Sequence, residues 1–136
     1  MNETSSYHER ALALHRRVPV VDAHCDTISF VLDDRTDMVG GDARMQVDVP
    51  RLIAGGVGIQ VLACWNEAEY SGHASFVRCM AKVGAFHRLA RLHGLRHITR
   101  PAQLDEPGLG FVLSMEDAAP VMGSDVHLEA LYAAGI

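Results

Sequence analysis

The amino-acid sequence predicts an α/β protein in which short apolar strands alternate with helices and form a parallel sheet. Three apolar runs support this prediction: Val20 to His24, Val57 to Trp65 and Leu109 to Met115. Each run is short, and helical patterns or turn residues separate one from the next. Strands without polar alternation are typical of parallel sheets, in which both faces are buried.

The composition indicates one globular domain over residues 1–136, since 49% of the residues are hydrophobic and 21% are charged. A net charge of −5 leaves no basic surface for a nucleic-acid partner. No stretch has the pattern of a signal peptide or of a membrane-spanning helix, and the three cysteines lack zinc-finger spacing. These features predict a cytoplasmic protein without a membrane segment.

The first expected element is a helix from Tyr7 to Arg17. Ser6 and Glu9 form a capping box at its start, and Pro19 ends it. The first apolar run then follows directly as a buried strand, because it is short, rich in β-branched residues and bounded by helix breakers.

A long loop is expected next, because residues 33–48 are polar and contain two adjacent glycines. One helical turn over residues 50–54 leads into the second strand. The glycines of "AGGVGIQ" precede this strand and no Lys-Ser/Thr follows them, so the sequence argues against a phosphate-binding loop. Tight packing at the amino end of the strand is the simpler interpretation.

A long helix is expected over residues 73–93, ended by Gly94. Its apolar side chains form one narrow stripe at helical spacing: Phe76, Met80, Val83 and Ala90. Its basic side chains lie off this stripe: Arg78, Lys82 and Arg88. After the third apolar run, Ser124 or Asp125 caps a last helix, which Gly135 ends.

Side chains that bind metals lie at the end of the first strand, in the stretch "VVDAHCDT". His24 and Asp26 are two residues apart, so on a strand they share a face; Asp22 shares it at a deeper level, and Cys25 points away. An imidazole nitrogen beside a carboxylate oxygen suits a cation such as zinc. The alternative is a core histidine that a carboxylate holds in place.

Glu116 is the second candidate, because it follows the third strand directly. Parallel α/β folds gather their sites at the carboxyl ends of the strands, so Glu116 is expected to converge with His24 and Asp26. A buried carboxylate there needs a cation or several donors. The alternative is that Glu116 or Asp117 begins a solvated loop, but beside the other two residues a metal site is the better interpretation.

The remaining candidates are weaker. His87 lies within the apolar stripe of the long helix and is expected to pack rather than to bind a ligand. Cys25 is disfavoured as a nucleophile because it is predicted to point away from His24. The other histidines of the second half are expected at the surface: His73, His93, His97 and His127.

Four stretches resemble the membrane (renal-type) dipeptidase family: "VVDAHCDT", "VDVPRLIAGGVGIQVLACW", "LSMEDAAP" and "LEALYAAGI". Members of this family are zinc metallopeptidases on a (β/α)₈ TIM-type barrel of the amidohydrolase type. The resemblance implies that residues 1–136 are a single incomplete domain, the N-terminal portion of such a barrel with about three β/α units. Many related amidohydrolases carry His-X-His on the first strand, so the His-X-Asp here points to the dipeptidase branch.

The resemblance also implies roles for individual residues. His24 and Asp26 match the two first-strand ligands of one zinc, and Glu116 matches the carboxylate that bridges both zincs. The implied function is that of a zinc-dependent dipeptidase, a metallopeptidase. Such a hydrolase acts in proteolysis and cleaves dipeptides with a metal-activated hydroxide. The complete enzyme is expected to use two Zn²⁺ ions, to take a dipeptide substrate and to form a homo-oligomer. Asp117 stands where the family usually has glycine.

In the family, the remaining zinc ligands and the catalytic and substrate-binding groups come from later strands. No catalytic residue beyond the metal ligands is therefore expected in this chain, and the isolated 136-residue chain is expected to be inactive. Two alternatives stay open. One is a non-catalytic truncated chain that needs a complementary polypeptide, and the other is a different metal-dependent amidohydrolase.

Overall fold

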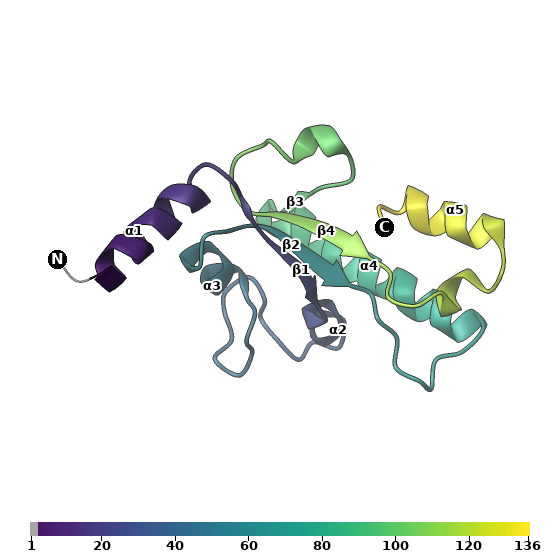
Figure 1. The fold of residues 1–136 in the computed structure, drawn as a ribbon. Helices are drawn as coiled ribbons and strands as arrows, with labels where there is room; N and C mark the ends of the chain where they lie inside the picture. Colours follow the sequence, from purple (N-terminus) through teal and green to yellow (C-terminus); the bar gives the residue numbers. More distant parts are fainter. Residues whose placement is uncertain (1–2) are drawn as a thin grey trace.

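The computed structural model describes residues 3–136, with side chains from residue 6 onward, and its centre is one parallel sheet. The sheet contains β1 (Val20–Cys25), β2 (Val57–Ala63), β4 (Gly110–Ser114) and β3 (Arg96–His97), in the spatial order β1-β2-β4-β3. The three longer strands are the three predicted apolar runs (Figure 1). The prediction of an α/β fold with a parallel sheet is therefore confirmed.

The longest helix lies along one face of the sheet, and the other helices lie near its edges and ends (Figure 1). Their bounds are α1 (Glu3–His15), α2 (Thr27–Leu32), α3 (Val49–Ala54), α4 (His73–His93) and α5 (Asp125–Ala133). Two short 3₁₀ turns lie on either side of β4: η1 (Pro101–Gln103) and η2 (Ala119–Val121). None of the helices in the described part of the chain is long and apolar enough to cross a membrane.

The structure differs from the prediction at three elements. Helix α1 begins at Glu3, so Ser6 lies inside the helix and does not cap it. Serine is tolerated in the first turns of a helix as well as at its cap, so it does not fix the start. Helix α2 and strand β3 were not predicted, because six and two residues are too short to show a periodic pattern.

The predicted loop over residues 33–48 is present and is held in place by Asp48. The Asp48 carboxylate caps α3 by accepting the backbone N–H of Arg51 at 2.9 Å, and it also accepts the N–H of Asp42 at 3.2 Å. Ser124 caps α5 as expected, since its hydroxyl accepts the N–H of His127 at 3.4 Å. The capping signal therefore predicted the start of α5 correctly, whereas the cap that Asp48 provides for α3 was not predicted.

The glycines at the amino end of β2 provide close packing, as predicted. A Cβ atom at Gly58 would lie 2.7 Å from the Cβ of Pro19, a distance at which one of the two segments would have to shift. Gly56 has a φ of +73°, a conformation that other residues rarely adopt. These glycines thus bring the amino ends of β1 and β2 together.

The hydrophobic core lies between the sheet and α4, where Val83 and Phe86 pack with Leu62, Phe111 and Leu113. The buried side of α4 is rotated relative to the predicted stripe. Its buried residues are Ser75, Cys79, Lys82, Val83 and Phe86, whereas Phe76, Met80 and Ala90 are only partly buried. The predicted stripe missed the serine, cysteine and lysine because it counted only strongly apolar residues.

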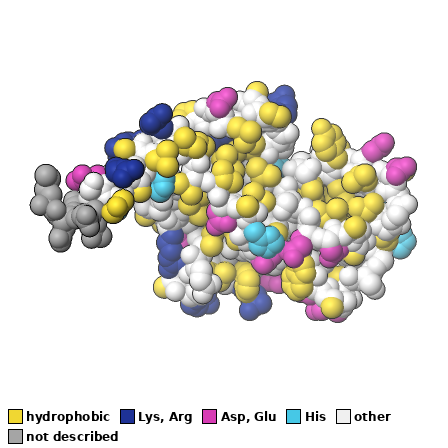
Figure 2. All heavy atoms as spheres, viewed as in Figure 1, with side chains coloured by type: hydrophobic (Ala, Val, Ile, Leu, Met, Phe, Trp, Pro, Cys, Tyr) yellow, Lys and Arg dark blue, Asp and Glu magenta, His cyan; other side chains and the backbone are white. Residues whose placement is uncertain are grey.

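The opposite face of the sheet is open. Val21, Val61 and Val112 line a wide groove of about 1020 Å³ there. Figure 2 shows hydrophobic side chains gathered on this face, together with a histidine that has acidic side chains beside it. In a closed β/α barrel the corresponding face is filled by layers of side chains from the other strands.

Candidate metal centre

The end of β1 is irregular, and this irregularity sets the direction of its side chains. Asp22 pairs with Gln60 and Cys25 pairs with Leu62, so β1 contains one residue more than β2 in this stretch. An extra residue of this kind changes the face to which the following side chains point, and such bulges are common beside functional sites. The prediction that Asp22 and His24 share a face by simple alternation is therefore wrong.

Asp26 lies just beyond β1 and is the residue before the first turn of α2, with φ −93° and ψ 9°. It therefore reaches the position beside His24 through the strand-to-helix turn and not as a strand residue. Cys25 does point away, as predicted, and packs against the hydrophobic core. Burial raises the pKa of the Cys25 thiol, so this residue is poorly suited to act as a nucleophile.

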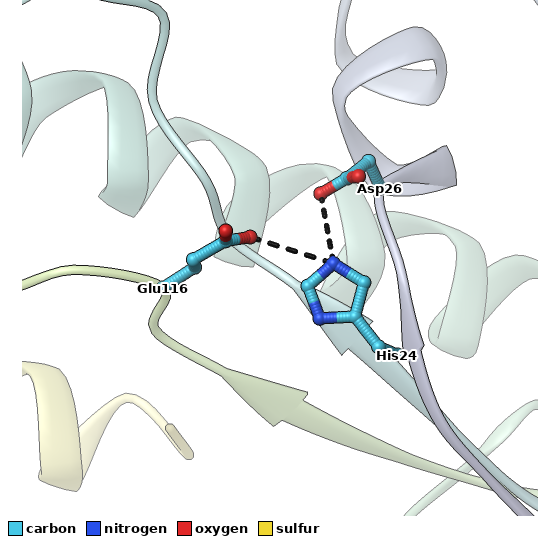
Figure 3. Close-up of side chains that lie close together, drawn as sticks. All are labelled: His24, Asp26 and Glu116. Atoms are coloured by element: carbon cyan, nitrogen blue, oxygen red, sulfur yellow. Dashed lines mark ion pairs between the residues drawn. The ribbon is translucent and has the colours of Figure 1, made fainter.

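His24, Asp26 and Glu116 converge at the carboxyl end of the sheet (Figure 3). The Nε2 atom of His24 lies 3.6 Å from Oδ1 of Asp26 and 3.4 Å from Oε2 of Glu116. One ligand atom from each residue lies within 4.8 Å of the other two. The predicted convergence is confirmed, and Glu116 is turned toward His24 instead of simply starting a solvated loop.

The two distances from His24 suit ligands of a single zinc ion. Two ligand atoms at about 2.0 Å from one zinc, in tetrahedral arrangement, are about 3.3 Å apart. The two distances from His24 Nε2, 3.6 and 3.4 Å, are close to that separation. The side chains are 53%, 48% and 44% exposed, which leaves the centre accessible for further ligands. An imidazole with two carboxylates is also a donor set that zinc accepts.

The turn after Glu116 explains the glycine that the resemblance implies at the next position. Asp117 has a φ of +62°, in the left-handed region that favours glycine. Its carboxylate stabilises the turn, because Oδ1 accepts the backbone N–H of Ala119 at 2.6 Å. Aspartate is among the few residues that tolerate this conformation, and its short polar side chain is the reason.

We expect Asp117→Ala to destabilise the chain by about 1–2 kcal/mol, because alanine keeps the unfavourable backbone conformation and loses the bond to Ala119. Asp117→Gly should be close to neutral, since glycine removes the conformational cost. Urea unfolding followed by circular dichroism measures both variants. Equal destabilisation by alanine and glycine would contradict this account of the turn.

The other histidines lie away from the centre, and three expectations about them were wrong. His87 is exposed and does not pack inside the core. His97 is half-buried in β3, where Nε2 lies 3.1 Å from the carbonyl oxygen of Gly135, and burial lowers the pKa of its imidazole. His127 is half-buried too, with its ring 4.7 Å from that of Phe76. Surface exposure was predicted for His97 and His127 because they lie on or near expected helices, and their burial was missed because their partners are distant in sequence.

Lys82 is the most unexpected residue near the centre, because its side chain is 0% exposed. Its ammonium group donates to the carbonyl oxygen of Trp65 and to Oδ1 of Asn66, the latter at 3.2 Å, and lies 3.7 Å from Oε2 of Glu67. Lys82 therefore holds the segment that follows β2. Lys82 lies three residues after Cys79 and four before Phe86, so on a helix it shares their buried side. This spacing is the signal in the sequence that could have indicated its burial.

Arg78 extends this support to α2. Its guanidinium donates to both carboxylate oxygens of Asp33 at 2.8 and 2.9 Å and to Oε1 of Glu67 at 3.0 Å. These hydrogen bonds hold the pKa values of Asp33 and Glu67 below their usual range. Arg78 and Lys82 thus connect α4 to the end of α2 at Asp33 and to the segment after β2 at Asn66 and Glu67.

A parallel β/α sheet with an imidazole and two carboxylates at the carboxyl ends of its strands is typical of metal-dependent hydrolases built on β/α barrels. The sequence profile of one such family, described as membrane dipeptidase (peptidase family M19), matches residues 8–136. The chain belongs to this family.

A solved structure agrees with this assignment. The chain is similar to the crystal structure of the dipeptidase AC, a metallopeptidase of family M19, with a TM-score of 0.77 and 19% sequence identity. The similarity covers 88% of this chain and 41% of that chain, so this chain spans less than half of the neighbour's length. The fold is therefore the N-terminal portion of a (β/α)₈-type barrel, as predicted. A search of curated proteins gave no match.

Proposed function

We propose that the chain provides the first part of a zinc-dependent dipeptidase, and that residues 1–136 form the N-terminal portion of its barrel domain. The observation that carries this proposal is the convergence of His24, Asp26 and Glu116 at the carboxyl end of the sheet. Barrel enzymes place their reacting groups at this edge. Membership of the M19 family supports dipeptides as the substrate class.

His24 and Asp26 would hold one zinc ion, and Glu116 would help to hold both this ion and a second one. When bound, divalent ions acidify a water molecule and polarise the carbonyl group of the bond to be cleaved. The role of this chain is to fix the three ligand atoms. The bulge in β1 directs His24, the first turn of α2 directs Asp26, and the left-handed turn at Asp117 directs Glu116.

We further propose that the chain by itself does not hydrolyse dipeptides. Within residues 6–136, whose side chains the structure describes, His24, Asp26 and Glu116 form the one cluster of three or more metal-binding side chains. A second ion would be left with a single carboxylate oxygen from Glu116, which is too few ligands for stable binding. Groups that orient a substrate and transfer a proton are also needed for efficient catalysis.

The experiment has two parts. Purified chain is first dialysed against zinc, and we expect it to bind one ion per chain and to release no amino acids from a dipeptide panel. The chain is then joined to the later β/α units of an M19 dipeptidase, and we expect hydrolysis that a chelator removes and zinc restores. Hydrolysis that survives complete removal of metal would refute the proposal. Cleavage of non-peptide amides but not of dipeptides would instead identify the activity of a different metal-dependent amidohydrolase.

A further inference from the structure

The bulge in β1 interrupts the regular pairing between β1 and β2 just before the metal centre. Asp22 pairs with Gln60, and Cys25 pairs with Leu62. Two residues of β1, the second of which is His24, thus lie opposite a single residue of β2. At a bulge the hydrogen-bond ladder is locally disrupted, so backbone groups there need other partners.

The carboxylate of Asp22 is one of these partners. Its Oδ1 atom accepts the backbone N–H of His24 at 3.1 Å. The bond joins residues that are two apart, so it closes a small ring in which an aspartate side chain bonds to its own backbone two residues on. This ring restricts the backbone torsions between Asp22 and His24, and the direction of the imidazole depends on those torsions.

Gln60 fixes Asp22 from the neighbouring strand. The Gln60 side chain is 0% exposed. Its Nε2 atom donates to the carbonyl oxygen of Val61 at 2.9 Å and, at 3.4 Å, to the carbonyl oxygen of Asp22. A side chain in a closely packed interior has few alternative rotamers, so this contact holds the backbone of Asp22 in place against β2. The bond from Asp22 to His24 therefore starts from a rigid part of the sheet.

The imidazole of His24 depends on its backbone for its direction, because packing holds it only weakly. Its side chain is 53% exposed, and its Nε2 atom points toward the carboxylates of Asp26 and Glu116 (Figure 3). Asp22 is half-buried and is not a member of the cluster of metal-binding groups. It therefore acts on the backbone that carries a ligand and not on the metal itself.

We propose that Asp22 is a positioning residue for the metal centre, because its bond to the N–H of His24 holds the bulge in the form that aims the imidazole at Asp26 and Glu116. The proposal rests on the proposed function, since His24 must bind zinc for its direction to matter. Loss of an outer partner of a metal ligand costs about 10- to 100-fold in metal affinity. Asp22 holds the backbone and not the ring, so we expect about tenfold, the lower end of this range.

Two variants of nearly equal shape test this role. Asp22→Asn removes the charge and keeps an oxygen that accepts the N–H, whereas Asp22→Leu removes the acceptor as well. Competition with a chromogenic chelator measures the zinc affinity of the full chain, which should fall about tenfold in Asp22→Leu and stay close to the original in Asp22→Asn. Asp105→Ala is the control, since this exposed carboxylate lies before β4, at the opposite end of the strands.

Hydrogen exchange of the His24 backbone N–H provides a readout that needs no metal. In the zinc-free chain, NMR should show this N–H exchanging about tenfold faster in Asp22→Leu, because the bond that protects it is lost. Asp22→Asn should keep most of the protection. Circular dichroism and urea unfolding check that each variant keeps the fold, and Asp22→Ala replaces Asp22→Leu if the leucine variant does not fold.

Unchanged zinc affinity in folded Asp22→Leu would overturn the proposal, and it would leave the proposed function standing if His24→Ala still loses zinc. Equal losses in Asp22→Asn and Asp22→Leu would also overturn it, because the charge and not the hydrogen bond would then be responsible. A chain that binds no zinc, or that binds it equally well in His24→Ala, would refute the proposed function and the role of Asp22 together.

Discussion

Replacing His24 with alanine is expected to lower the affinity of the chain for zinc by more than about 100-fold, since loss of even an outer partner of a metal ligand costs about 10- to 100-fold. The Nε2 atom of His24 lies within 3.6 Å of both carboxylates and is the one nitrogen in the cluster. Without it, two half-exposed carboxylates remain, and such a pair binds zinc weakly. Competition with a chromogenic chelator measures the affinity of the chain and of the variant.

A matched control is available in the same chain. His8 is exposed on α1, which extends away from the sheet (Figure 1), so His8→Ala should leave zinc affinity unchanged. Glu116→Gln should weaken binding strongly as well, because the amide keeps the shape of the side chain and removes its charge. Zinc affinity that is unchanged in His24→Ala would show that the ion binds elsewhere and would remove the basis of the proposed function.

Replacing Lys82 with alanine is expected to destabilise the fold by roughly 3–5 kcal/mol, the range for emptying a large core position or removing one partner of a buried ion pair. Lys82 is fully buried, and its ammonium group binds the carbonyl oxygen of Trp65 and the side chain of Asn66. Its loss leaves a cavity under the segment after β2 and leaves these acceptors without a donor. Urea unfolding of the zinc-free chain measures the change in the free energy of unfolding.

Two further variants separate the causes. Lys82→Met refills the volume without the donor, so it should recover part of the loss and retain a cost of about 1–3 kcal/mol for the unsatisfied acceptors. Arg88→Ala on the exposed side of α4 should change stability by less than about 0.5 kcal/mol, because its ion pair with Asp34 is solvent-exposed. If Lys82→Met were as stable as the unchanged chain, the hydrogen bonds of Lys82 would contribute nothing measurable.

Local sequence patterns were sufficient for much of the fold. The three longer strands lie in the three apolar runs, α4 spans residues 73–93 as predicted, and Ser124 caps α5. Each of these features depends on residues that are neighbours in the chain, such as a run of β-branched residues, a helical repeat or a capping side chain. The same holds for placing His24 and Glu116 at strand ends, because His24 ends the first apolar run and Glu116 directly follows the third.

The features that only the tertiary structure decided all join distant segments. The extra residue in β1 is defined by its register against β2, and it invalidates the simple alternation that the sequence suggests for Asp22 and His24. The burial of Lys82 depends on acceptors 16 and 17 residues away, which no helical repeat contains. A cavity lined by Asp26, Phe30 and Trp65 exists because the segments after α2 and after β2 lie beside the same strand ends. Burial and ion pairing of this kind follow from packing between elements, so they cannot be seen in the pattern of any single element.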